Sequence, residues 1–133
     1  MGLYLRSVLE KRHRPTKLGR LKVTVDHHVI KELVLNDLLF ANAFPASMSK
    51  YDITIGIKSE YQTSSGIWVS TSAGSTAAIH AAGGKVMPIL SRKMQYLVRE
   101  PYTASGQYKL LKGILKETEP LSIRSDMKNG TIY

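Results

Sequence analysis

The hydrophobic and polar positions of this chain alternate in several short segments, and the alternation predicts a protein built mainly from β-strands. Apolar residues occupy every second position at 51–57, and the same period of two runs through 21–25. Since successive side chains of a strand point to opposite faces, each segment predicts a strand with one buried face. Shorter apolar runs predict further strands at 29–35, 67–69, 94–98 and 121–123.

Two turns are expected to join neighbouring strands. The polar residues 26–28 separate the runs 21–25 and 29–35, which together predict a hairpin. Residues 128–130, Lys-Asn-Gly, have the composition of a tight hairpin turn, so the strand that begins at Leu121 is expected to turn back on itself. Because too few residues follow for a full return strand, we expect the domain to be truncated at its C-terminus.

The remaining segments are less regular. Residues 3–10 have a loosely helical arrangement of apolar positions, and residues 40–48, which are small, polar and interrupted by Pro45, are predicted to form a loop. The polar residues 58–65 lead into the segment around Gly74. Residues 110–115 fit a short helix and a strand equally well. The pattern therefore predicts a mainly β domain of the α+β class.

One helix is expected in the middle of the chain, directly after the strand 67–69. Small hydroxyl residues cluster around Gly74, and the alanine-rich segment Ala77–Ala82 then propagates a helix well. Gly83 and Gly84 end it, since glycine is the usual residue past a helix C-terminus. The predicted order is strand, small-residue turn, short helix, stop.

Such a turn can bind a ligand or merely change the chain direction. The first N–H groups of a helix lack intrahelical partners, and glycine lets a flat ligand approach the backbone. The simpler alternative is that Ser72 or Ser75 caps a buried helix. The hydroxyl groups available to either role are those of Ser70, Thr71, Ser72, Ser75 and Thr76.

Composition narrows the class of protein. The 133 residues suit one domain, no apolar run is long enough to span a bilayer, and there is no cysteine for disulfides or thiolate metal sites. We therefore expect a cytoplasmic protein without membrane association. His27 and His28 lack further ligands at a metal-binding spacing, so they are interpreted as turn residues.

The net charge of +9 is concentrated near the N-terminus. We expect residues 1–20 to form a basic helical lead-in and residues 21–133 to form a β-rich nucleotide-binding domain. The basic lead-in could bind a polyanion or simply be solvated, but no aromatic residues interleave with it, which argues against nucleic acid. Seven of the 19 basic residues lie in the first 22 positions: Arg6, Lys11, Arg12, Arg14, Lys17, Arg20 and Lys22.

The segment 64–87 resembles the C-terminal, NAD-binding domain of the NAD kinase family. That family carries Asp-Gly, three apolar residues, Ser-Thr-Pro-Thr-Gly-Ser-Thr-Ala-Tyr, and then Ala-Gly-Gly. A second family marker, an Asn-Glu pair, is similar to Asn36-Asp37. The matching residues of the long motif are Gly66, Ser70, Thr71, Gly74, Ser75, Thr76, Ala77, Gly83 and Gly84.

The resemblance implies a fold and an activity. The fold would be the β-sandwich-like domain of the NAD kinase and diacylglycerol kinase group, with one short helix after the Gly74 turn. The activity would be phosphorylation of the 2′-hydroxyl of the NAD adenosine ribose to give NADP, with ATP or polyphosphate as donor and Mg²⁺ or another divalent metal. The family's Gly-Gly-Asp-Gly-Thr loop is absent from this sequence. We therefore expect no catalytic residue or metal ligand in this chain, which would be inactive alone.

The resemblance also implies which residues bind NAD. Ser65, Ser72 and Ala78 depart from the family's Asp, Pro and Tyr, and Asp37 is one methylene shorter than the family's Glu. The turn itself would consist of Ser70, Thr71, Gly74 and Ser75. The implied NAD-binding residues are Asn36, Asp37, Ser65, Thr76, Ala77 and Ala81.

Other functions stay open at this stage. A P-loop, the dinucleotide fingerprint and a serine-hydrolase elbow are all absent from the sequence. The main alternative is a basic β-rich module that binds nucleotides or forms oligomers without catalysis. A relative of lipid or diacylglycerol kinases is a third hypothesis. The kinase interpretation implies a homo-oligomer and a missing N-terminal catalytic domain as partners.

Overall fold

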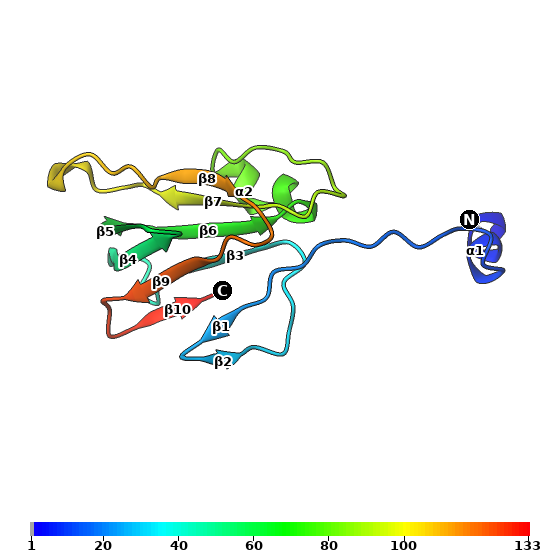
Figure 1. Ribbon diagram of the computed structural model, residues 1–133, viewed down its shortest axis with the longest axis horizontal. Helices are drawn as coiled ribbons and strands as arrows, with labels where there is room; N and C mark the ends of the chain where they lie inside the picture. The colour runs from blue at the N-terminus through cyan, green and yellow to red at the C-terminus, as the bar shows by residue number, and fades with distance from the viewer. Residues whose placement is uncertain (1) are drawn as a thin grey trace.

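Ten strands in residues 2–133, the part of the chain that the computed structural model describes, form three antiparallel sheets (Figure 1). The strands of the largest sheet are β3 (Asp37–Asn42), β6 (Gly66–Thr71), β7 (Met94–Arg99), β8 (Lys112–Leu115) and β10 (Gly130–Ile132). Their order is β10–β3–β6–β7–β8. The mainly β prediction is confirmed.

A second sheet of three strands covers one face of the first. Its strands are β4 (Ser49–Ile55), β5 (Lys58–Ser64) and β9 (Leu121–Ser125), in the order β5–β4–β9. The rings of Phe40 on β3 and Tyr51 on β4 meet edge to face at 5.8 Å between centroids. Residues of both sheets thus share one core, which consists of Leu38, Phe40, Tyr51, Ile53, Ile67, Val69, Tyr96, Val98 and Leu115.

The hairpin expected after residue 21 is present, but its strands are short. It consists of β1 (Thr24–Val25) and β2 (His28–Val29), extended by a bridge between Leu21 and Val34. Asp26 and His27 at the turn both have positive φ, of 47° and 67°. This is the backbone that a two-residue hairpin turn requires, and here it forms without glycine.

The expected loop 40–48 is present over residues 43–48, but its first residues belong to β3, and the polar segment after residue 57 is a strand. Phe40 and Ala41, at the start of the expected loop 40–48, are buried in β3, and the polar segment 58–64 is β5. The sequence analysis did not predict β5, because Gln62 and Ser64 are polar residues that are buried and hydrogen-bonded to Tyr51. The undecided segment 110–115 contains the strand β8.

The hairpin predicted around 128–130 is also wrong. β9 pairs with β4 in the three-stranded sheet, whereas β10 pairs with β3 in the five-stranded sheet. The turn therefore carries the chain from one layer to the other. Two backbone hydrogen bonds hold this crossing, from Asp126 N–H to the Lys50 carbonyl at 2.9 Å and from Ala43 N–H to the Asn129 carbonyl at 2.8 Å.

A buried polar network links Tyr51 to the segment before β8. The Tyr51 hydroxyl bonds the Ser64 hydroxyl at 2.6 Å and donates to the Gln62 side-chain oxygen at 3.2 Å. The Gln62 amide in turn donates to Glu60 at 2.7 Å and to the Leu110 carbonyl at 3.0 Å. Burial raises the pKa of Tyr51 to about 12, so the phenol stays protonated and remains a donor in this network.

The Glu60 carboxylate clamps the chain that leads into β8. It accepts hydrogen bonds from the backbone N–H groups of Lys109 and Leu110, each at 2.9 Å. Burial disfavours its charged form, but these N–H groups and the Gln62 amide outweigh burial and lower the pKa of Glu60. The clamp therefore depends on an ionised carboxylate.

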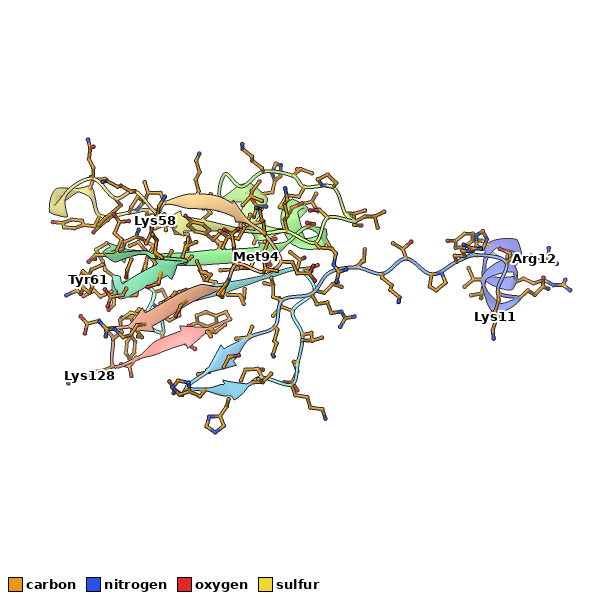
Figure 2. The ribbon with its side chains drawn as sticks, in the orientation of Figure 1. Lys11, Arg12, Lys58, Tyr61, Met94 and Lys128 are labelled. Atoms are coloured by element: carbon orange, nitrogen blue, oxygen red, sulfur yellow. The ribbon has the colours of Figure 1, made fainter. Side chains whose placement is uncertain are left out.

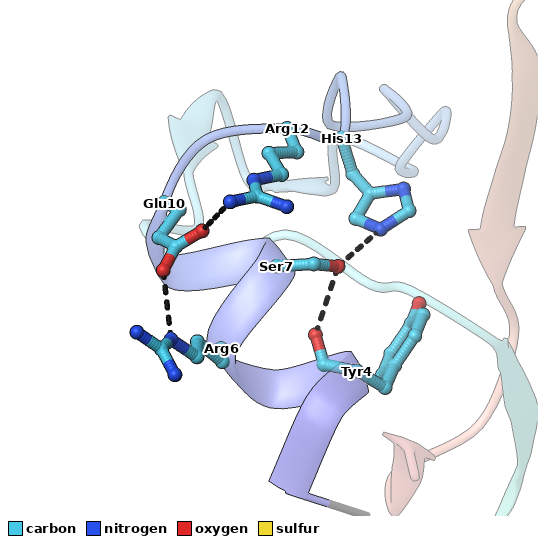
Figure 3. Close-up of polar contacts among 6 residues, drawn as sticks. All are labelled: Tyr4, Arg6, Ser7, Glu10, Arg12 and His13. Atoms are coloured by element: carbon cyan, nitrogen blue, oxygen red, sulfur yellow. Dashed lines mark hydrogen bonds and ion pairs between the residues drawn. The ribbon is translucent and has the colours of Figure 1, made fainter.

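The helix α1 (Gly2–Leu9) lies away from the sheets, at the end of an extended segment (Figure 1). Glu10 pairs with both Arg6 and Arg12, and Ser7 bonds the His13 ring (Figure 3). Lys11 and Arg12 are exposed and lie far from the sheets (Figure 2). No helix of the described residues is long and apolar enough to cross a bilayer. A division of the chain after residue 20 stays a prediction.

We expect Glu60→Gln to destabilise the fold at neutral pH by about 1 kcal/mol, because one amide oxygen replaces two charged acceptors. The folded pKa of Glu60 is lowered, so its contribution is complete above the unfolded pKa and is lost as the pH falls through the folded pKa. The free energy of unfolding of the wild type, measured with urea, should fall below about pH 4.5. In the variant it should fall less. Glu32→Gln, at an exposed position, is the control. An unchanged acid dependence in Glu60→Gln would contradict the prediction.

Candidate functional site

The segment after β6 has the predicted order of strand, turn, helix and stop. β6 ends at Thr71 and is followed by a 3-10 turn, η1 (Ala73–Thr76), and a short helix, α2 (Ala78–Ala81). Gly83, just past α2, has a φ of 100°, as expected of a glycine that ends a helix. The helix covers part of the predicted range Ala77–Ala82. We call Ser72–Gly83 the bend.

Most hydroxyl groups in and before the bend are used internally. Ser70 donates to the Thr71 carbonyl at 2.7 Å, and Ser72 donates to the Lys93 carbonyl at 3.1 Å. Ser75 donates to the Ser72 carbonyl and accepts from the Met87 N–H, both at 2.8 Å. Ser72 does not cap η1 with its side chain. The predicted turn residues are thus buried, and the hydroxyl groups of this segment, which we call the frame hydroxyls, hold the bend in place through internal hydrogen bonds.

The Asn36 backbone lies directly against the bend. The Thr71 N–H donates to the Asn36 carbonyl at 2.9 Å, and the Thr71 hydroxyl bonds the Leu35 and Asn36 carbonyls and accepts from the Gly74 N–H. A Cβ at Gly74 would lie 2.1 Å from the Asn36 oxygen, which is too close for any side chain. The two sequence motifs, far apart along the chain, therefore meet at Gly74. The Asn36 residue is itself exposed.

Asp37 reaches the start of the helix. Its Oδ2 accepts a hydrogen bond from the backbone N–H of Ile79 at 3.1 Å. Ile79 is fully buried, whereas Thr76, Ala78 and Ala81 are exposed and Ala77 is half-buried. One side of the bend is therefore packed onto the sheet, and the other side, which includes predicted site residues, faces solvent.

A hollow of about 350 Å³ lies beside α2 on the outer face of β6 and β7. Ser65 donates to Glu100 at 2.5 Å, so the predicted residues Ser65 and Ala81 border the same surface. Glu100 has a positive φ of 42°, which is strained for a residue with a side chain. The residues that line the hollow are Trp68, Ala78, Ala81, Ala82, Leu97, Arg99 and Glu100.

Sequence reasoning did not include Trp68, Arg99 or Glu100 among the site residues. They meet because β6 and β7 pair with Trp68 opposite Leu97 and Gly66 opposite Arg99. That register depends on pairing between distant segments, so no local pattern could reveal it.

The loop after α2 is held by the side chain of Gln95, a residue of β7. The buried side chain of Gln95 accepts from the Lys85 N–H at 3.0 Å and donates to the Lys85 carbonyl at 2.7 Å. A Cβ at Gly84 would lie 2.8 Å from the Ile79 carbonyl oxygen, so this glycine is needed for close packing. Asn36 and Asp37 therefore contact the bend itself, and Gln95 holds the loop that follows it.

The described residues show no arrangement suited to hold a metal ion. No three His, Cys, Asp or Glu side chains of residues 2–133 converge. His28 contacts the Asp26 carbonyl within its own hairpin turn, and His80 lies near the Gly84 carbonyl at the end of α2.

Comparison of the sequence with known proteins points to one group, although no family model matches the chain. It is 35% identical over 136 residues to a probable NADH kinase of Oryza sativa, an alignment that covers 97% of this chain and 42% of the rice protein. It is 43% identical over 70 residues to an NADH kinase of Arabidopsis thaliana, which covers 53% of this chain. The chain thus spans less than half of the length of these curated relatives.

Solved structures share the fold. Yeast NADH kinase, solved with NADH, aligns with a TM-score of 0.82 over 99% of this chain and 39% of its own length, at 19% identity. The resemblance to the NAD kinase family is confirmed. An NAD kinase of Archaeoglobus fulgidus, solved with ATP, aligns with a TM-score of 0.66 over 98% of this chain and 59% of its own, at 14% identity. The roles of the individual NAD kinase-like residues stay predictions.

We expect Gly74→Ala to destabilise the fold by at least ~3 kcal/mol, because a methyl group cannot coexist with the Asn36 carbonyl and the backbone must shift. Gly83→Ala is the matched control, since a Cβ there meets no atom within 4 Å and only the positive φ is penalised, by about 1–2 kcal/mol. Denaturant unfolding of both variants measures the difference. Equal losses would show that the contact with Asn36 is not tight.

Proposed function

We propose that this chain forms the dinucleotide-binding part of a kinase that phosphorylates the adenosine ribose 2′-hydroxyl of NAD or NADH. The observation that carries the proposal is the contact between Asn36-Asp37 and the Gly74 bend within an NAD kinase-like fold. The sequence relatives named NADH kinase support the same substrate class. ATP is the proposed donor, and the ATP complex of the archaeal structural neighbour supports this choice.

The exposed face of the bend is the proposed site for the adenosine. The Asn36 amide carries two donors and an acceptor, and the exposed Thr76 hydroxyl is both donor and acceptor. The small side chains of Ala77 and Ala81 let a flat ring approach the backbone. Since the frame hydroxyls are already bonded internally, we propose that Asn36 and Thr76 supply the side-chain contacts.

The hollow beside α2 is the proposed site for the rest of the dinucleotide. Trp68 and Leu97 offer apolar surface, and Trp68 could replace part of the aromatic wall that Ala78 lacks. The Arg99 guanidinium suits a phosphate, and the Glu100 carboxylate, held by Ser65, can accept from hydroxyl or amide groups.

The transfer itself needs groups that this sequence does not contain. A bond forms between the ribose 2′-oxygen and the γ-phosphorus of ATP, the bond to the bridging β,γ-oxygen breaks, and the hydroxyl proton passes to a base. Within residues 2–133, no three side chains of His, Cys, Asp or Glu come together. We therefore propose that a separate catalytic domain supplies the phosphate loop, the base and the metal ligands.

The proposal extends to assembly and location. We propose a homo-oligomer, which is supported by the edge strands that end the two larger sheets: β5 and β9 in one, β8 and β10 in the other. We propose a cytoplasmic location on the ground that the sequence lacks cysteine.

We expect calorimetric titration to show saturable binding of NAD or NADH to the chain. Asn36→Ala and Thr76→Val should each weaken it about five- to tenfold, the value of one lost hydrogen bond. Asn36→Ala keeps the backbone carbonyl that holds the bend, so the fold should persist. Thr118→Val, an exposed threonine between β8 and β9, is the control. Binding of oligonucleotides alone, weakening steeply with salt, would favour the non-catalytic polyanion-binding alternative.

We also expect the purified 133-residue chain, given NAD, ATP and Mg²⁺, to form no NADP. The reason is the missing Gly-Gly-Asp-Gly-Thr loop, without which the γ-phosphate has no cradle. An enzymatic cycling assay for NADP is sensitive enough to decide. Sustained NADP formation above an ATP-free control would show that the catalytic groups lie within this chain.

A further inference from the structure

We infer that Asp37 acts on ligand binding as a positioning residue, because its carboxylate anchors the start of α2 and so fixes the exposed part of the bend. This inference rests on the proposed function and specifies what one residue of the site does. It differs from the role implied by family resemblance, in which the acidic residue of the Asn-acid pair contacts the adenosine directly.

No side chain at the start of α2 accepts a hydrogen bond from the first N–H groups of the helix. Its N-cap is Ala77, whose side chain cannot accept the hydrogen bonds that the first N–H groups of a helix leave open. Ile79 is the second residue of the helix, and its N–H is one of those groups. Asp37 Oδ2 accepts it at 3.1 Å from a strand 42 residues earlier in the chain. Asp37 therefore replaces the missing capping side chain.

The neighbouring residue holds the other end of the same segment. The Asn36 carbonyl accepts from the Thr71 N–H at 2.9 Å and packs on the backbone of Gly74. Asn36 and Asp37 thus hold the chain before and after η1, and the exposed Thr76 lies between the two points of contact. If either contact is lost, the orientation of Thr76 and Ala77 is no longer set by Asn36 and Asp37 together.

The hydrogen bond also limits what Asp37 can do for a ligand. Ser70 lies opposite Asp37 in the pairing of β3 and β6, and its hydroxyl donates to the Thr71 carbonyl rather than to Asp37. The Ile79 N–H occupies Oδ2, whereas Oδ1 can still accept from a ligand. A positioning role through α2 is therefore tested against a direct contact through Oδ1 by varying the ligand.

A ligand comparison separates positioning from direct contact. Calorimetry of wild type and Asp37→Ala should be carried out with NAD and with an NAD analogue whose adenosine ribose lacks both hydroxyls. We expect Asp37→Ala to weaken both ligands by the same factor, on the order of tenfold, because the lost contact is with Ile79 and not with the ribose. Asp37→Asn, whose amide oxygen can still accept that N–H, should restore most of the affinity. A loss confined to NAD and absent with the analogue would overturn the inference.

Hydrogen exchange of the ligand-free chain gives a second readout. We expect the Ile79 amide to exchange on the order of tenfold faster in Asp37→Ala and near the wild-type rate in Asp37→Asn. Asp52→Ala, which removes a surface ion pair with Arg124, is the control and should leave this amide unchanged. If Asp37→Ala does not fold, Asp37→Ser, too short to reach Ile79, gives the same comparison. Unchanged exchange at Ile79 would overturn the inference.

Calorimetry and hydrogen exchange distinguish failure of the positioning role from failure of the proposed function. If wild type binds no NAD or NADH, the proposed function fails, while exchange at Ile79 still decides whether Asp37 anchors α2. If wild type binds NAD and exchange at Ile79 does not depend on Asp37, the positioning role fails and the proposed function stands.

Discussion

The structure of the candidate site depends on one close contact, between the Asn36 backbone and Gly74. Only a hydrogen atom fits in that position, because a Cβ would lie 2.1 Å from the Asn36 oxygen. The contact lets the Thr71 N–H and hydroxyl reach the Asn36 carbonyl, and it brings Asp37 within hydrogen-bond distance of Ile79. Without it, the bend and the start of β3 would be separate surface features.

The sandwich makes this contact possible. β3 and β6 are neighbours in the five-stranded sheet, with Asp37 opposite Ser70, so the start of one strand lies beside the end of the other. Their inward residues, such as Phe40 and Ile67, are buried against the second sheet. Core packing therefore fixes the register of the two strands, and that register brings the two motifs of the site together.

Much of this could be predicted from the sequence. The period-two segment at 51–57, the turn around Gly74 and the stop at Gly83 are local patterns, and each appears in the structure close to where it was expected. The strand 58–64 was missed because Gln62 and Ser64 are buried through bonds to Tyr51, which no hydrophobic pattern records. Glu100 and Trp68 came together only through the pairing of β6 with β7.

The crossing between β9 and β10 has a consequence for how the protein folds. β10 completes its pairing with β3, some ninety residues earlier in the chain, while β9 pairs with β4 in the opposite layer. Neither layer of the sandwich is therefore complete until these two strands have paired. Such distant pairing makes folding slow, so apolar residues of both layers stay uncovered until β9 and β10 are in place. A chaperone that shields those faces would have most to protect before these two strands pair.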